Sequence, residues 1–140
     1  MGNRALVIFY DEHRISPTVY LHWNGGKVPK LLGDLAEYMT GRSGDAGYAA
    51  ARFTGLCHKL ISGNLSLGLM ANTLRCADLE DAAVLESMSH GDAGVVIVNT
   101  DDFTWKAYGG YLAKRQRSAA SEAKHTLITP LTKTDETKEK

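Results

Sequence analysis

The chain has 140 residues, of which 44% are hydrophobic and 23% charged, and its acidic and basic side chains balance to a formal net charge of zero. This composition is typical of one globular domain and differs from that of disordered or fibrous chains. A zero net charge gives no general attraction to nucleic acid or to anionic membranes, so we expect neither as a partner. Without a leader peptide or an apolar run of membrane-spanning length, we expect a cytoplasmic protein.

Two strands are predicted at the start of the chain. Arg4 to Tyr10 is a short run that is apolar on both faces, which indicates a central strand. Thr18 to Trp23 follows a polar loop and is rich in branched and aromatic residues, which favour a partner strand. Side chains alternate along a strand, so Val19, Leu21 and Trp23 are expected on one face.

The second strand runs into Asn24-Gly25-Gly26, residues that tolerate the positive φ of a sharp turn. In a structural interpretation, Trp23 is a core residue and the glycines only make the turn. In a functional interpretation, free backbone N–H groups of the turn bind a phosphate, and neighbouring aromatic rings stack on the ligand. The residues of this predicted ligand-binding site are Tyr20, His22, Trp23, Asn24, Gly25 and Gly26.

Two amphipathic helices are predicted next. Apolar residues recur at helical spacing over Lys27 to Thr40, and again from Asp45 to Ile61. The glycine-containing segment Gly41 to Gly44 separates the two helices, and Gly63-Asn64 ends the second. Both helices should therefore pack on the sheet with their apolar faces.

Three further strands are predicted in the second half. Leu65 to Ala71 alternates leucine with other residues, which predicts a strand with one buried face. The acidic stretch Asp78 to Asp92 is expected to be a loop with a short helix around Leu79 to Met88. Gly94 to Thr100 and Phe103 to Tyr108 then predict a second hairpin.

These elements predict an α+β fold with the order ββααβββ, a mainly antiparallel sheet of about five strands and two helices on one face. The domain should span residues 1–112, followed at 113–140 by a basic segment and a mobile tail. A bare second face would expose side chains such as Phe9 or Tyr20, and large apolar patches mark interaction surfaces. We therefore expect a homodimer through the open face or an edge strand.

Three motifs resemble a family of small uncharacterised proteins of phages, prophages and bacteria. They are Met-Gly-Asn-Arg-Ala at residues 1–5, Tyr-Leu-His-Trp-Asn-Gly-Gly at 20–26 and Gly-Asp-Ala-Gly-Val-Val-Ile-Val at 91–98. The resemblance covers about residues 1–110. It implies a small protein of a mobile element and supplies no catalytic residues.

No catalytic or metal-binding constellation is predicted. His22, His58 and His90 could act as bases for Cys57 or Cys76, but no nucleophile elbow is present. His90, Asp92 and Glu86 lie close in sequence without a second histidine at ligand spacing, which favours a solvated loop over a metal site. We therefore expect neither enzymatic activity nor a cofactor.

The leading prediction is a non-enzymatic protein-interaction module of a phage or mobile element. Its partner would be a host protein, such as a nucleic-acid-binding CRISPR effector whose basic surface attracts acidic residues. The alternative is a small-ligand or nucleotide binder built on the glycine turn. The predicted partner-binding residues are Asp78, Glu80, Asp81, Glu86, Asp92, Asp101 and Asp102.

Overall fold

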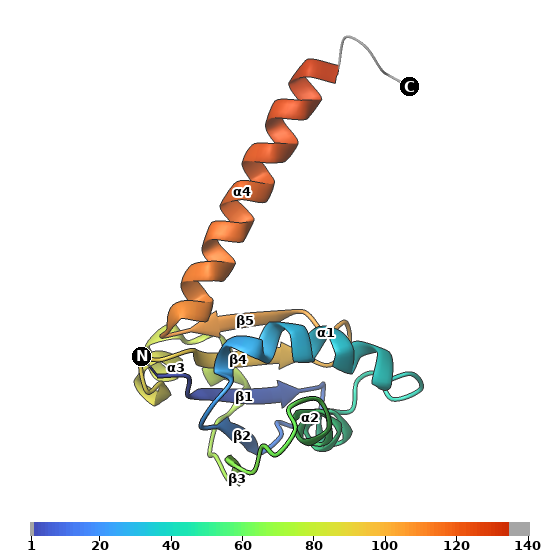
Figure 1. Cartoon of the computed structure of the whole chain (residues 1–140), viewed down its shortest axis with the longest axis vertical. Helices are drawn as coiled ribbons and strands as arrows, with labels where there is room; N and C mark the ends of the chain where they lie inside the picture. Colours follow the sequence, from blue (N-terminus) through green and yellow to red (C-terminus); the bar gives the residue numbers. More distant parts are fainter. Residues whose placement is uncertain (1, 135–140) are drawn as a thin grey trace.

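The computed structural model describes residues 2–134, with side chains described as far as residue 122. One sheet of five strands has the order β3-β2-β1-β4-β5 (Figure 1). β1 and β4 run parallel and the other neighbours are antiparallel, so the prediction of a mainly antiparallel sheet with a central first strand is confirmed. The strands are β1 (Ala5–Tyr10), β2 (Thr18–Leu21), β3 (Leu67–Met70), β4 (Gly94–Asn99) and β5 (Trp105–Tyr108).

Two helices cover the first face of the sheet, as predicted. The turn η1 (Gly25–Lys27) leads directly into α1 (Val28–Tyr38), and α2 (Ala46–Leu60) follows a glycine-containing loop. Asp45 caps α2, because its side chain accepts a hydrogen bond of 3.0 Å from the backbone N–H of Tyr48.

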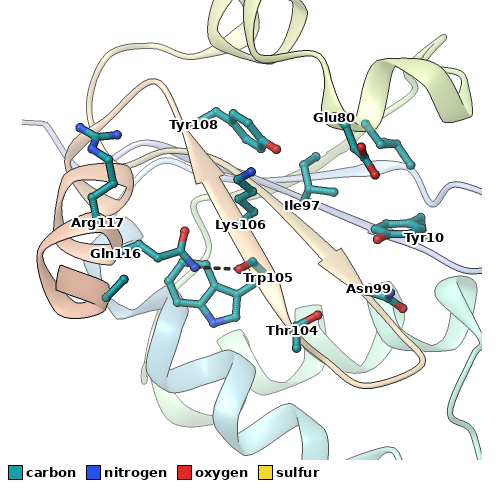
Figure 2. Close-up of a pocket in the computed structure, with 12 residues that line it drawn as sticks. Tyr10, Glu80, Ile97, Asn99, Thr104, Trp105, Lys106, Tyr108, Gln116 and Arg117 are labelled. Atoms are coloured by element: carbon teal, nitrogen blue, oxygen red, sulfur yellow. Dashed lines mark hydrogen bonds between the residues drawn. The ribbon is translucent and has the colours of Figure 1, made fainter. Parts of the chain in front are cut away.

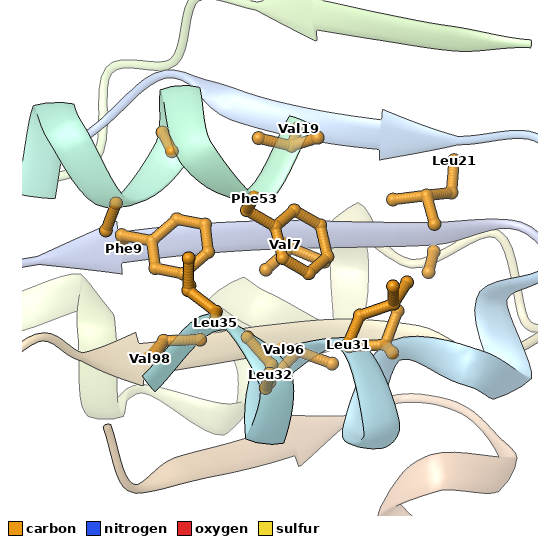
Figure 3. Close-up of a cluster of buried hydrophobic side chains, with 14 of the residues drawn as sticks. Val7, Phe9, Val19, Leu21, Leu31, Leu32, Leu35, Phe53, Val96 and Val98 are labelled. Atoms are coloured by element: carbon orange, nitrogen blue, oxygen red, sulfur yellow. The ribbon is translucent and has the colours of Figure 1, made fainter. Parts of the chain in front are cut away.

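The main core lies between this face and the two helices (Figure 3). Phe9 of β1 packs on Phe53 of α2 with ring centroids 5.5 Å apart, and Leu35 of α1 closes the cluster. All three side chains are fully buried. The apolar residues of β1, α1 and α2 therefore face the core, as their periodicity predicts.

The second face is also covered, so the prediction of a bare face is wrong. The segment between β3 and β4 crosses it and contributes η2 (Cys76–Glu80) and α3 (Ala82–Met88). Leu79 and Leu85 of this segment form a second core with side chains of β1 and β4. Tyr20 packs against this core, whereas Phe9 belongs to the opposite face.

The last described element is α4 (Tyr111–Thr134), which projects from the β5 side of the molecule (Figure 1). Leu112 and Ala113 in its first turn are buried in the main core, so the helix begins inside the predicted domain boundary at residue 112. The predicted mobility of the tail stays a prediction, and residues 135–140 lie outside the described residues. Within the described residues, no helix combines the length and the apolar character needed to cross a membrane.

Candidate functional site

Most of the predicted partner-binding carboxylates are already engaged within the fold. Asp78 accepts a 2.8 Å hydrogen bond from the backbone N–H of Arg75, and Asp81 caps α3. Asp102 accepts hydrogen bonds from the backbone and the hydroxyl of Thr104, which lower its pKa below the ordinary value. These side chains shape turns and helix starts, which is the usual role of aspartate at such positions.

The acidic residues also lie at two different ends of the sheet. Asp92 precedes β4 and pairs with Arg4, with 2.7 Å between the guanidinium Nε and the carboxylate. Hydrogen bonds from the guanidinium and then from the backbone N–H of Arg4 lower the pKa of Asp92. Asp101 and Asp102 instead follow the opposite end of β4, so the seven residues do not form one acidic surface.

Glu80 belongs to a shallow groove of about 670 Å³ on the second face, between η2, the β4–β5 hairpin and α4 (Figure 2). Tyr10 and Tyr108 line the groove together with Lys106 and Arg117. Burial raises the pKa of both tyrosines, and the Glu80 carboxylate raises both further. The phenols are therefore neutral at physiological pH, and the groove presents a mixed aromatic and charged surface without an activated nucleophile.

A second groove of about 750 Å³ lies at the other end of the sheet, where α4 begins. Glu86 and Asp92 line it opposite the basic side chains Lys114, Arg115 and Arg117. The charges of this groove are thus mixed as well. Among the described residues, no cluster of three or more histidine, cysteine or carboxylate side chains could hold a metal ion.

The aromatic residues of the predicted ligand site gather on the surface. The hydroxyl of Tyr20 lies 2.7 Å from Nδ1 of His22, and the His22 ring contacts the Trp23 ring edge-on at 4.7 Å between centroids. The ring of His90 lies edge-on to that of Tyr20, with 5.7 Å between the centroids. Trp23 is 51% exposed, so the interpretation of this residue as part of the core is wrong.

The glycine turn itself is occupied by structural contacts. The backbone N–H of Gly25 donates to the carbonyl of Asn3 at 2.8 Å, and that of Lys27 donates to the carbonyl of Asn24 at 2.9 Å. Asn24 adopts the left-handed conformation that the turn requires, with φ of 67°. The Gly25 amide, which the predicted phosphate site would use, is therefore already paired, and the ligand-binding role of these residues stays a prediction.

The two edge strands of the sheet, β5 and β3, differ in whether their outward backbone groups have hydrogen-bond partners. In the β4–β5 pair, Trp105 and Ala107 direct their backbone groups away from β4, toward the edge. Gln116 of α4 satisfies both: its amide N–H₂ donates to the carbonyl of Trp105 at 2.7 Å, and its amide oxygen accepts from the N–H of Ala107 at 3.0 Å. The β5 edge is thereby closed against another strand.

The β3 edge has no such cover within the described residues. The N–H of His22 donates to the carbonyl of Ser66, so Ser66 and every second residue after it face β2. Leu67 and Leu69 therefore direct their N–H and C=O groups outward. No hydrogen bond in the described part of the chain reaches these groups.

Exposed apolar side chains gather beside these groups. Of the seven large apolar side chains that are exposed in the described residues, five belong to β3 or to segments around it: Leu69 and Met70 are in β3, Leu65 precedes it, Trp23 follows the residue that pairs with Ser66, and Leu60 ends α2. Leu67 packs against the main core, but Leu65 and Leu69 are 84% and 62% exposed, so the predicted burial of this face is wrong for both of them. We call this set the β3 edge surface: Trp23, Leu60, Leu65, Leu69 and Met70.

The β3 edge surface also lacks charge. The sequence from Leu60 to Leu74 contains no acidic, basic or histidine residue. Natural edge strands are commonly protected by charged residues or proline, and neither is present here. This uncharged run is the sequence signal that could have pointed to the surface.

The two cysteines differ in accessibility, which predicts a difference in reactivity. Cys57 is buried on α2, as its place on the apolar face predicts, and burial raises the pKa of its thiol to about 12. A thiolate is the reactive form, so Cys57 should not react in the folded protein. We expect an aromatic disulfide reagent to titrate one thiol, the exposed Cys76, in the native protein and both thiols in denaturant. Fast reaction of both thiols in the native protein would contradict this placement.

Comparisons with known protein families, with curated proteins and with solved structures found no match. The resemblance to phage and prophage proteins stays a prediction from the three sequence motifs.

Proposed function

We propose that this protein is a non-enzymatic protein-interaction module that binds its partner by strand addition at β3. The observation that carries the proposal is the coincidence of free backbone groups and exposed apolar side chains on one uncharged edge. Main-chain hydrogen bonds at such an edge supply affinity, and flanking side chains supply specificity. Contiguous exposed apolar patches are rare on monomeric proteins and mark interaction sites.

The closed β5 edge strengthens the argument. Gln116 pairs with the backbone groups at the β5 edge, whereas the outward backbone groups of Leu67 and Leu69 have no partner among the described residues. The exposed aromatic rings of Tyr38 and Tyr48 lie elsewhere and have cationic neighbours, which are Lys59 for Tyr38 and Arg42 and Arg52 for Tyr48. In the described part of the chain, the β3 edge surface thus combines exposed apolar side chains with backbone N–H and C=O groups that have no partner.

The test compares three tagged proteins: the wild type, Leu69→Lys and the control Ala51→Lys. Leu69 is mostly exposed, so a lysine there leaves the core intact but protects the edge with a charge. Ala51 is exposed on α2, so its lysine adds the same charge away from the edge. Equal thermal midpoints for the three proteins will show that all are folded.

We expect the wild type and Ala51→Lys to retain a stoichiometric partner from lysate of the source cell, and Leu69→Lys to lose it. The decisive readout is the difference between the two lysine variants. Equal retention by both variants would place the binding surface elsewhere on the molecule. Retention of no partner by any of the three, together with a wild type that does not self-associate, would contradict the proposal.

The acidic residues predicted from the sequence provide a further arm of this test. Because Glu80 and Glu86 lie in different grooves, the double variant Glu80→Lys, Glu86→Lys changes charge without touching the β3 edge surface. The proposal expects this variant to keep its partner. Loss of the partner here, with retention by Leu69→Lys, would favour an acidic surface that engages a basic host-defence protein.

A further inference from the structure

We propose that the partner at the β3 edge surface is a second copy of this chain, paired antiparallel through β3 about a two-fold axis at Gly68. This inference rests on the proposed function, because it names the partner of the same surface. It follows from the backbone directions, from the place of the glycine and from the absence of charge.

The backbone directions select one register. Only residues whose N–H and C=O groups point outward can form the hydrogen-bonded pairs of a new antiparallel ladder. In β3 these residues are Leu67 and Leu69. When Leu67 lies opposite Leu69 of the second copy, the outward N–H and C=O groups of both residues form hydrogen bonds between the two chains. Registers centred on Leu67 or Leu69 would instead pair one of them with a residue outside β3.

Gly68 lies on the axis in this register. Two copies of Gly68 would face each other as a non-hydrogen-bonded pair, the type with the closest approach, at about 4.5 Å between Cα atoms. A Cβ added to Gly68 would meet no atom within 4 Å in the single chain. The glycine is therefore not required by packing within one chain, and a side chain introduced at this position has room at the axis.

The side chains are self-complementary in the same register. Leu67 and Leu69 share the face of the sheet that α1 and α2 cover, so the four leucines of two copies would meet across the axis. The run from Leu60 to Leu74 carries no charge, and the whole chain has zero net charge. Two copies therefore bring no like charges of this run together, and each covers the exposed Leu69 of the other in an isologous interface.

The first measurement is sedimentation velocity over a wide range of protein concentration. We expect the wild type and Ala51→Lys to form a dimer as concentration rises and Leu69→Lys to stay a monomer. A wild type that is monomeric at every concentration would overturn the inference. A dimer that persists in Leu69→Lys would overturn it as well, because that dimer would form through another surface.

The second measurement tests the register by disulfide formation in a Cys76→Ser background. Gly68→Cys places two thiols at the axis, where the separation of the Cα atoms suits a disulfide. Ser66→Cys is the matched control, because its two thiols would lie about 13 Å apart along the strands, beyond disulfide reach. We expect mild oxidation to cross-link Gly68→Cys into a dimer and to leave Ser66→Cys uncross-linked.

Cross-linking of Ser66→Cys in preference to Gly68→Cys would overturn the proposed register. The lysate experiment separates this inference from the proposed function. If the wild type is a monomer but Leu69→Lys still loses a captured protein, the second copy is excluded and strand addition to a different protein stands. If neither self-association nor capture depends on Leu69, both proposals fail.

Discussion

Replacing Gly25 by alanine should destabilise the fold by about 3 kcal/mol, because the added methyl group has no space. Its Cβ would overlap the carbonyl oxygen of Asn3 and would lie 2.8 Å from the Cβ of Ala93. The first contact is with backbone that also accepts the Gly25 N–H, so relief requires moving the start of the first strand. Urea unfolding of the purified variant measures the loss.

Gly26→Ala is the matched control, one residue further along the turn. Its Cβ would lie 3.1 Å from the hydroxyl of Tyr111, which is the end of a side chain that can move. We expect a cost below about 1 kcal/mol. If both variants were equally stable, the close approach at Gly25 would not be a constraint on the fold. A larger loss for Gly25→Ala than for Gly26→Ala would show that close packing excludes a side chain at Gly25.

The periodicity of the sequence was sufficient to predict the elements that make the main core. Apolar alternation in strands and apolar stripes on helices indicate which side of an element faces the interior. The structure confirms this prediction for residues such as Phe9, Leu35 and Phe53. The parallel pairing of β1 with β4 follows from no local pattern, because it depends on how the long connection between them folds.

The errors of prediction concern what covers each strand. Leu65 and Leu69 alternate like residues of a half-buried strand, yet α2 packs over β1 and leaves the outer strand exposed. Conversely, the acidic stretch before β4 contains the predicted short helix, but the pattern did not predict that Leu79 and Leu85 of this stretch complete a second core. A local pattern identifies an apolar face without identifying the element that buries it.

The candidate site was missed for a related reason. The acidic residues were interpreted as a charged binding surface. However, Asp78 lies within η2 and Asp81 directly precedes α3, positions where aspartate commonly caps backbone N–H groups. The informative feature was the absence of charge over residues 60–74, next to a predicted strand. An edge strand is recognised only when the sheet order is known, and the sequence does not give that order.

Asp11 is a buried polar position where substitution by alanine should have a large effect on stability. The sequence places it in a polar loop, but the side chain is buried and joins that loop to the start of α2. One carboxylate oxygen accepts from the N–H of Ala46 at 2.8 Å, and the other accepts from His13 and Arg14 at 2.7 and 2.9 Å. The guanidinium of Arg14 lies 3.3 Å away.

Asp11→Ala should lower the free energy of unfolding by about 4 kcal/mol, because it leaves a buried N–H donor at the start of a helix without an acceptor. Asp34→Ala is the control: Asp34 makes only an exposed ion pair with Lys30, at 3.2 Å. Such pairs contribute about 0.5 kcal/mol or less. Urea unfolding of both variants at neutral pH should show this contrast, and similar losses would contradict the role of Asp11.

The same carboxylate should make stability depend on pH. Burial alone would raise the pKa of Asp11, but hydrogen bonds from Ala46, His13 and Arg14 outweigh it and lower the pKa below the ordinary value. The stabilisation is therefore fully present above the unfolded-state pKa of about 3.9 and is lost as pH falls through the folded-state pKa. The pKa values of Asp92 and Asp102 are lowered as well, so they contribute with the same sign.

Asp11→Asn isolates the contribution of this one group. We expect the wild type to lose stability as pH falls below about 4, and the asparagine variant to be less stable at neutral pH but to lose less on acidification. The two curves should therefore converge at low pH, where the wild-type carboxylate is protonated. Parallel curves for the two proteins would show that Asp11 has the same pKa in the folded and unfolded chains.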